Sequence, residues 1–404
     1  MALAVIGPGL MVMLADTDAG SVVTAAQSGA RWGFRLIGLQ VLLIPVLYLI
    51  VELTARLGLV TGKGHARLIR EHFGRWWALL AVAALLLSAT GAMVTELAGM
   101  VGAGSLAGLS PPAVLAIALP VLTLVVLSGS YRRVELIGVG FGLFELAFFV
   151  AAAHAHPDPA RMVASLWARP PLGHVGYRTL VAANVGAVLM PWMIFYEQAA
   201  VVAKGLDRRC LRVVRLDIAI GAVLTQAVMI AIMVAAAAAA AAARPGVSHG
   251  AWQTVGQISA ALTPALGAAG GRLAFALGIA GAALVAAIVV ALASAWALGE
   301  LLDAPRSLAQ GVGRAPVFYG TYLVMLAVAA ALVLVSPSLI RISIDAEVVN
   351  AVLLPVVLGF LLVLAWRELP PGARPRRIGW SALFAVGVGV ALMGALATWT
   401  SLGP

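Results

Sequence analysis

The sequence predicts an all-α integral membrane protein. Of its 404 residues, 63% are hydrophobic and only 10% are charged, and the mean hydropathy is +1.05. A soluble globular chain carries about 25% charged residues. The apolar runs are roughly 18–25 residues long, which is the length that a helix needs to cross a hydrocarbon core of about 30 Å. None of the runs alternates as a strand would, and an open sheet cannot satisfy its backbone in lipid, so we expect helices.

Counting these runs gives eleven spans. Their approximate limits are 4–28, 34–58, 77–105, 112–130, 135–154, 179–203, 214–243, 272–299, 316–336, 346–366 and 379–401. Spans one and six each carry an interruption near the middle, and these two interruptions define the rest of the interpretation.

The basic residues that give the net charge of +10 lie mainly in the loops, and their distribution predicts the orientation of the chain in the bilayer. If the N-terminus is cytoplasmic, 18 of the 26 Lys and Arg residues fall in inner loops and 8 in outer loops. The positive-inside rule therefore predicts a cytoplasmic N-terminus and, with an odd number of spans, an outer C-terminus. We expect a multi-pass protein of the prokaryotic plasma membrane, with the lipid bilayer and no nucleic acid as partner. The sequence does not specify the oligomeric state.

The first interruption is acidic. An apolar helix stops at Asp16 and Asp18, passes through the small residues Ala19, Gly20 and Ser21, and then resumes. Each ionised side chain at bilayer depth costs at least about 2.5–3.5 kcal/mol on insertion scales, so such residues normally face a cavity or a pathway. We expect Asp18 to face a cation site.

The second interruption lies in span six, where Gly186 and Pro191 flank Ala187 and Met190. Proline removes a backbone donor and frees carbonyl groups that can face an ion. Two broken helices five spans apart predict an inverted five-plus-five repeat with a binding site at the midplane. The chain 1–404 is then one transmembrane transporter domain, with repeat one at about 1–156, repeat two at about 178–368 and an accessory helix at about 379–401.

Other acids support a path for cations. Glu96 and Glu197 lie deep in spans three and six, and no Lys or Arg lies deep in any span, an asymmetry that favours positive ions. We expect three further acids to be solvated or interfacial because they lie nearer to span ends. These are Glu52, Glu145 and Glu300. No motif typical of an enzyme or of a bound cofactor is present, and the single cysteine, Cys210, excludes an intramolecular disulfide.

Several motifs in order make the chain resemble the Nramp family of divalent metal transporters, which has the LeuT-type fold. Gly7-Pro8-Gly9 followed by Asp18-Ala19-Gly20-Ser21 is similar to the family's G-P-G and D-P-G-N. The run from Arg56 to Lys63 resembles R-L-G-x-V-T-G-K, and the run from Ala187 to Pro191 resembles A-x-x-M-P. The resemblance covers essentially the whole chain.

The departures from the family pattern are specific. Ser21 replaces the metal-binding asparagine, Trp192 and Glu197 stand at two histidine positions, and Gly99 replaces a glutamate beside Glu96. Those histidine and acid positions are implicated in proton transfer in the family. The pattern is most similar to the Nramp-related magnesium transporter branch, and it predicts transport that is not proton-coupled.

The resemblance implies uptake of Mg²⁺, and of Mn²⁺ as well, by alternating access. The expected metal ligands are Asp18, Ser21, Ala187 through its carbonyl, and Met190. The expected pathway or gate residues are Asp16, Glu96, Glu197 and Asn350. Magnesium dehydrates reluctantly and suits a short serine that leaves room for water, whereas a thioether selects softer ions.

Met190 therefore either contacts a dehydrated Mn²⁺ or lines a wider hydrated cavity. The alternatives to this function are a proton-coupled Mn²⁺/Fe²⁺ transporter, a sodium-coupled amino-acid symporter of the same fold, and a membrane enzyme or passive channel. Asp18 argues against the symporter, since the break in that class is usually neutral. We expect no cofactor, because the ion is the cargo.

Overall fold

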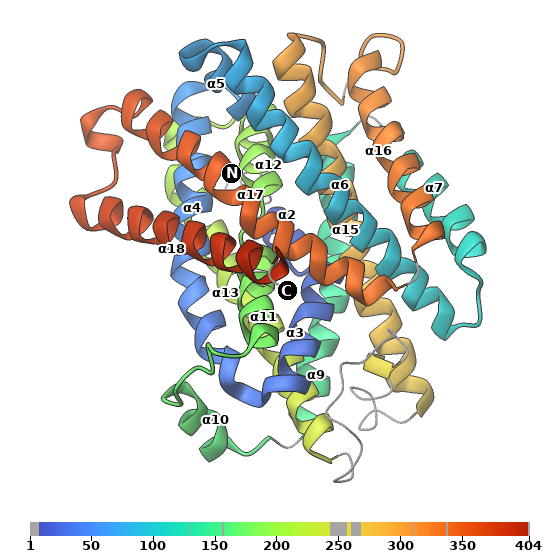
Figure 1. Ribbon diagram of the computed structural model, residues 1–404. Coiled ribbons are helices and arrows are strands. Elements are labelled where there is room, and N and C mark those ends of the chain that lie inside the picture. The colour runs from blue at the N-terminus through green and yellow to red at the C-terminus, as the bar shows by residue number, and fades with distance from the viewer. Residues whose placement is uncertain are drawn as a thin grey trace.

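The protein is a bundle of helices (Figure 1). The computed structural model describes residues 8–128, 130–155, 157–242, 257–259, 268–308, 310–336 and 338–402, and none of these residues is in a strand. Gly7 of the first motif, the start of predicted span one and residue 243 of predicted span seven lie outside the described residues. The all-α prediction is confirmed.

The helices follow the predicted spans in order. In the first half of the chain they are α2 (Pro8–Asp16), α3 (Ala19–Trp32), η1 (Gly33–Leu36), α4 (Ile37–Thr61), α5 (His65–Phe73), α6 (Arg75–Leu106), α7 (Pro111–Leu127), α8 (Tyr131–Gly142), η2 (Leu143–Leu146), α9 (Ala147–His154) and α10 (Pro159–Leu166). In the second half they are α11 (Val175–Val188), α12 (Pro191–Ala203), η3 (Arg208–Cys210), α13 (Leu211–Ala242), α15 (Ala268–Leu302), α16 (Pro316–Val335), α17 (Leu339–Glu368), η5 (Pro371–Ala373) and α18 (Arg377–Leu402).

By length and hydropathy alone, eight stretches of the described chain could cross a bilayer, compared with eleven predicted spans. The difference has simple causes. The first span is split at its break, and its second half continues through η1 into α4, so Ala19–Thr61 counts as one stretch. The fourth span is the 17-residue helix α7, and in the eleventh span the apolar stretch Gly379–Gly389 is also shorter than 18 residues.

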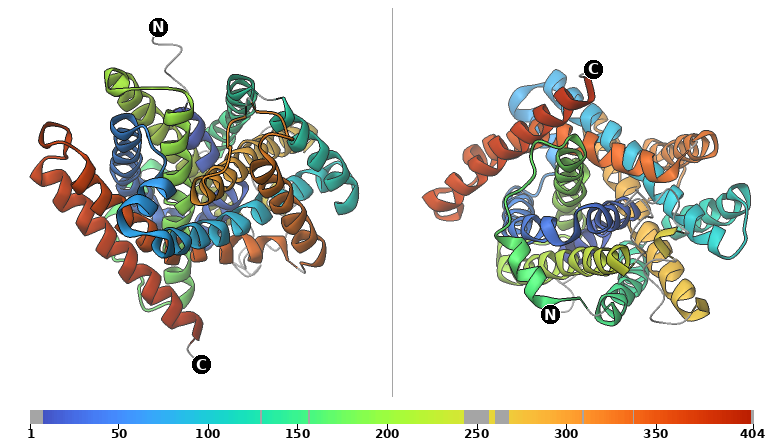
Figure 2. Two further views of the ribbon diagram at one scale, coloured as in Figure 1. Left: turned by 90° about the horizontal axis from the view of Figure 1, so that it is seen from above. Right: turned by 60° about the horizontal axis from the view of Figure 1, so that its bottom comes forward.

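The two broken helices lie at the centre of the bundle. In the apolar window of Val175–Ala203, which covers α11 and α12, 94% of the residues are buried, compared with 28% in Arg132–His154. Helix α3 packs against α13, α17, α11 and α6. Helices α7 and α18 lie at opposite edges of the bundle (Figure 2). The breaks are therefore enclosed by other helices and do not face lipid.

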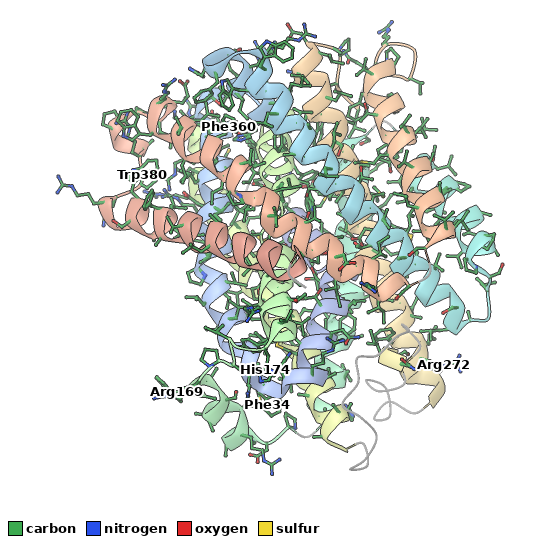
Figure 3. The ribbon with its side chains drawn as sticks, viewed as in Figure 1. Phe34, Arg169, His174, Arg272, Phe360 and Trp380 are labelled. Atoms are coloured by element: carbon green, nitrogen blue, oxygen red, sulfur yellow. The ribbon has the colours of Figure 1, made fainter. Side chains whose placement is uncertain are left out.

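Loops that the charge count assigns to the same side of the bilayer come together in space. Phe34, Arg169, His174 and Arg272 lie at one end of the bundle, whereas Phe360 and Trp380 lie away from it (Figure 3). Trp32 packs on His174 at this end, with ring centroids 5.7 Å apart. The segments that carry Phe34, Arg169, His174 and Arg272 therefore share one end of the bundle.

The loop after α4 explains why its motif contains a glycine. Gly62 ends α4 with φ 63°, a left-handed conformation that glycine adopts without a steric cost. The loop then contacts α12, because Gln198 donates from Nε2 to the Lys63 carbonyl at 2.9 Å, and the Gln198 Oε1 lies 2.9 Å from His65 Nδ1. The loop and the second broken helix are thus joined.

Candidate functional site

The first break places Asp18 at the start of a helix. Helix α2 ends at Asp16 and α3 begins at Ala19, with Asp18 as its N-cap in extended conformation. Its Oδ1 accepts a hydrogen bond from the Ser21 backbone N–H at 2.6 Å, as aspartate commonly does at this position. The other carboxylate oxygen, Oδ2, is buried and has no hydrogen-bond partner among the described residues. That oxygen is available to a ligand.

The second break lies directly opposite the first. Helix α11 ends at Val188 and α12 begins at Pro191, the first helical position, where the missing N–H of proline costs nothing. The Ser21 hydroxyl donates to the Ala187 carbonyl at 3.1 Å. Two residues that are 166 positions apart are thereby in contact, so the structure brings Asp18, Ser21 and Ala187 together.

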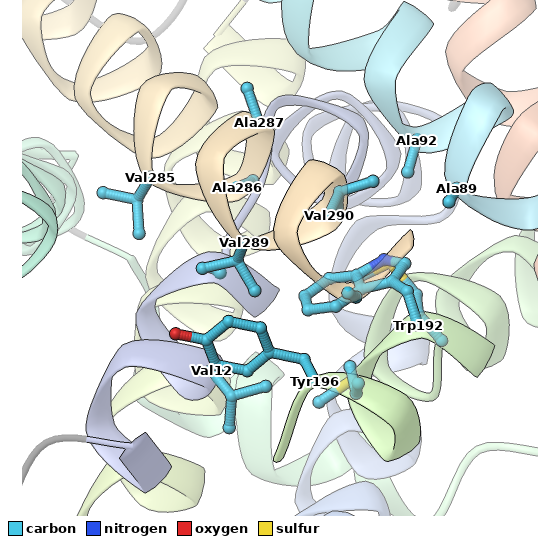
Figure 4. Close-up of a cluster of buried hydrophobic side chains, with 14 of the residues drawn as sticks. Val12, Ala89, Ala92, Trp192, Tyr196, Val285, Ala286, Ala287, Val289 and Val290 are labelled. Carbon is cyan, nitrogen blue, oxygen red and sulfur yellow. The ribbon is translucent and has the colours of Figure 1, made fainter. Parts of the chain in front are cut away.

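Met190 lies at the same break, with its sulfur engaged. It is 1% exposed, and Trp192 donates from Nε1 to its Sδ at 3.0 Å. Trp192 and Tyr196 lie beside Val289 and Val290 of α15 (Figure 4), and Trp192 is completely buried. The tryptophan that stands where the family has histidine therefore covers the thioether.

Glu96 of α6 reaches the first break. Its Oε2 accepts from the Ala19 N–H at 3.1 Å, and its Oε1 accepts from the Thr95 hydroxyl at 3.1 Å. It also interacts electrostatically with Asp18. The predicted pathway residue Glu96 therefore lies beside the candidate site.

The predicted residue Asn350 is hydrogen-bonded to Glu347, an acid that we did not predict as part of the site. Asn350 donates from Nδ2 to Glu347 Oε2 at 3.0 Å and accepts from the Ser88 hydroxyl at 2.5 Å. The other oxygen, Glu347 Oε1, is buried without a partner in the described chain, and a Cβ on Gly20 would lie only 2.2 Å from it. Glu347 thus faces the break. Its position three residues before Asn350, on one helix face, was the available signal.

Among the described residues, no hydrogen bond joins the remaining predicted acids, Glu197 and Asp16, to Ser21 or Ala187. Glu197 is fully buried, without a hydrogen-bond partner among the described residues, and it interacts electrostatically with Asp217 and Lys204. Asp16 is 1% exposed at the end of α2. Within the described residues, no group of three or more His, Cys, Asp or Glu side chains is placed to hold a metal ion. Any ion at the breaks therefore needs mixed ligands.

Glu52, Glu145 and Glu300 were expected to be solvated or interfacial, and the solvated alternative is wrong. They are 3%, 1% and 4% exposed. Glu52 pairs with Arg56 and with Arg215, whose Nε lies 2.7 Å away. Glu300 accepts from the first turn of α5 through the Arg67 N–H at 3.2 Å. Glu145 lies in the short turn η2, which packs on α15. Partners within the protein compensate the burial of Glu52 and Glu300, whereas Glu145 has the Thr17 hydroxyl as a neighbour and no ion pair or hydrogen bond of normal geometry within the described chain.

The fold and the two meeting breaks define a multi-pass membrane protein with the LeuT-type fold. Residues 9–401 match the family described as "Natural resistance-associated macrophage protein-like". The chain belongs to this Nramp family, whose members are transporters rather than enzymes.

Similar proteins were found by sequence and by structure. The chain is 29% identical over 240 residues, 57% of each chain, to a "Divalent metal cation transporter MntH" of Pectobacterium carotovorum. It is 30% identical over 200 residues to a protein of the same name from Verminephrobacter eiseniae, covering 47% of this chain and 44% of the relative. The match therefore spans about half the length of these relatives.

Two solved structures show the fold. The Eremococcus coleocola manganese transporter, in complex with an aromatic bis-isothiourea substituted compound, superimposes with a TM-score of 0.75 at 16% identity, over 99% of this chain and 94% of that one. A transporter of the nucleobase-cation-symport-1 family in a closed conformation gives 0.59 at 14% identity, over 98% and 90%.

Proposed function

We propose that this protein takes up Mg²⁺, and also Mn²⁺, by alternating access and without obligatory proton coupling. The observation that carries the proposal is the free Oδ2 of Asp18 at the point where the Ser21 hydroxyl meets the Ala187 carbonyl. A fixed negative charge between two interrupted helices is the arrangement in which transporters of this kind hold ions. The names of the bacterial relatives support divalent metal as the cargo.

The residues have distinct proposed roles. Asp18 supplies the fixed charge, and Ser21 with the Ala187 carbonyl either orients the waters of the ion or binds it directly. Glu347 adds a second carboxylate oxygen beside Gly20, and Asn350 closes the site from α17. Three further acids, Asp16, Glu96 and Glu197, make the path electronegative.

The hydrogen bond between Trp192 and Met190 supports Mg²⁺ over softer ions. A thioether favours metals such as Mn²⁺ or Fe²⁺, but here an indole N–H occupies the sulfur at 3.0 Å. Oxygen ligands then remain for the ion, as Mg²⁺ prefers. We propose that Met190 lines the cavity during Mg²⁺ transport and coordinates only a dehydrated Mn²⁺.

We further propose that the N-terminus is cytoplasmic and the C-terminus is outside, and that the chain is one domain with repeats at about 1–156 and 178–368. Arg169 and Arg272 lie at the same end of the bundle (Figure 3), which supports a shared side of the bilayer for these two predicted outer loops; the choice of that side rests on the positive-inside rule.

A flux assay tests the proposal. Protein reconstituted in liposomes should accumulate Mg²⁺, Asp18→Ala should abolish uptake, and the exposed acid Asp345 provides a matched control in Asp345→Ala. The signal of a pH-sensitive dye inside the vesicles should stay constant during uptake. Full transport by Asp18→Ala would overturn the site, and acidification with each ion would overturn the uncoupled mechanism.

The alternative is a proton-coupled Mn²⁺/Fe²⁺ transporter in which Glu96 and Glu197 relay protons in place of the missing histidines. The complete burial of both carboxylates favours it. Met190→Ala separates the two functions. If Mn²⁺ transport is lost while Mg²⁺ transport persists, the ions bind in two modes as we propose. Loss of both makes Met190 a general ligand and favours the alternative.

A further inference from the structure

A second group of buried oxygens lies at the first break, close enough to interact electrostatically with Asp18. The Thr17 and Thr225 hydroxyl oxygens are 2.5 Å apart, joining the end of α2 to α13. Asp16 lies beside Thr225, and Glu145 of η2 lies beside Thr17. The four side chains are at most 2% exposed. Asp16 ends α2 and Thr17 follows it in the break, whereas Thr225 belongs to α13 and Glu145 to η2.

The charges of this group are uncompensated. The hydroxyls of Thr225 and Thr17 are neighbours of the Asp16 and Glu145 carboxylates, but among the described residues none of the four carboxylate oxygens has a hydrogen bond of normal geometry. Within the same residues, neither acid forms an ion pair. Helix α2 ends at Asp16, so its last carbonyls add further negative charge. A buried carboxylate without a partner is costly unless it is protonated or coordinates a cation.

The composition of the group indicates which cation it would take. Two carboxylates and two hydroxyls offer up to six oxygen atoms and neither nitrogen nor sulfur. Oxygen ligands suit hard ions such as Mg²⁺, which favours octahedral coordination, and a divalent charge neutralises both acids.

We propose that Asp16, Thr17, Glu145 and Thr225 form a second Mg²⁺ site next to the transport site. The inference rests on the proposed function only in taking Mg²⁺ as the available ion. Because its ligands are oxygen alone, this site favours hard ions, whereas the other site also offers the Met190 thioether to a softer ion.

Binding stoichiometry tests the proposal. Calorimetric titration of the purified full-length protein with MgCl₂ should show two ions for the wild type, one for Asp18→Asn, one for Glu145→Gln and none for the double variant. Asp345→Asn, an exposed acid on α17, should retain two. Titration with CdCl₂ should show a tighter binding event that is lost in Asp18→Asn and kept in Glu145→Gln, because only the site at Asp18 includes a thioether.

The outcomes separate the two proposals. If the wild type binds one Mg²⁺ that Asp18→Asn removes and Glu145→Gln does not, the second site is refuted and the transport site stands. If no variant binds Mg²⁺, both fail. Should Glu145→Gln not fold, Thr225→Val removes one hydroxyl at equal size and should weaken the second binding event by about tenfold or more. Unchanged affinity in Thr225→Val would refute the assignment.

Discussion

The contact between α11 and α17 leaves no room for a side chain at Gly186. A Cβ there would lie 1.7 Å from the Glu347 backbone oxygen and 3.0 Å from the Ala351 nitrogen. Because both neighbours are backbone atoms, the helices themselves must separate. Restoring the 3.4 Å at which ordinary contact begins requires a displacement of about 1.7 Å along that direction.

The Gly186→Ala variant should therefore be destabilised by about 2 kcal/mol, because a clash with backbone atoms places the overpacking cost at about 3 kcal/mol, and alanine gains about 1 kcal/mol of helix propensity over glycine. The neighbouring Ala187 carbonyl should also shift, lowering Mg²⁺ uptake. Thermal unfolding in detergent and liposome flux measure both effects. Gly176→Ala, on the same helix with nothing within 4 Å, is the control. Unchanged stability and full uptake in Gly186→Ala would refute the close approach.

Three further variants test other contacts. Asn184→Ala removes the acceptor of the Gln40 amide at 2.7 Å and the donor to Ser28 at 2.8 Å. It should lower the unfolding free energy by about 1–3 kcal/mol for each buried group left unpaired. The exposed Ser381→Ala is the control and should leave the melting temperature unchanged. A melting temperature of Asn184→Ala equal to that of the wild type would contradict the expectation. Trp192→His removes the hydrogen bond to the Met190 sulfur and adds an imidazole, so the affinity for Mn²⁺ should rise relative to that for Mg²⁺ in competition titrations. The rise should be larger than in Trp192→Phe. An unchanged preference would show that the indole N–H does not keep the sulfur from the ion. The Lys63 ammonium, together with Arg67, holds the pKa of Glu71 below its usual 4.5. Because the folded pKa is the lower one, these ion pairs stabilise the protein fully above the usual value and cease to do so as the pH falls through the lowered one. Glu71→Gln should therefore cost at most about 1 kcal/mol at pH 7, and a pH series of melting curves should show the difference vanishing in acid.

The sequence predicts the breaks because their causes are local. Asp18 and Ser21 form an N-cap within four residues, and Pro191 fits only the first turn of a helix. Hydropathy likewise places the long helices, since span length depends on the bilayer. These features need no knowledge of which helices are neighbours.

The acids were harder to place because their surroundings are tertiary. Distance from a span end was the only available guide for Glu145, and it failed because η2 packs on α15. Glu347 approaches Gly20 from a helix more than 300 residues away in the chain, a contact that no local pattern encodes. The sequence alone therefore gives the kind of site but not the full set of acids around it.

One turn of α17 touches both broken helices. Glu347 faces Gly20 of the first break through its side chain and Gly186 of the second break through its backbone carbonyl. The two interruptions consequently share a mechanical support, so a displacement of this turn during the transport cycle moves both together. We therefore expect few residue types other than glycine at positions 20 and 186 in related sequences. A larger side chain at either position would displace α17 and so change its contact with the other broken helix.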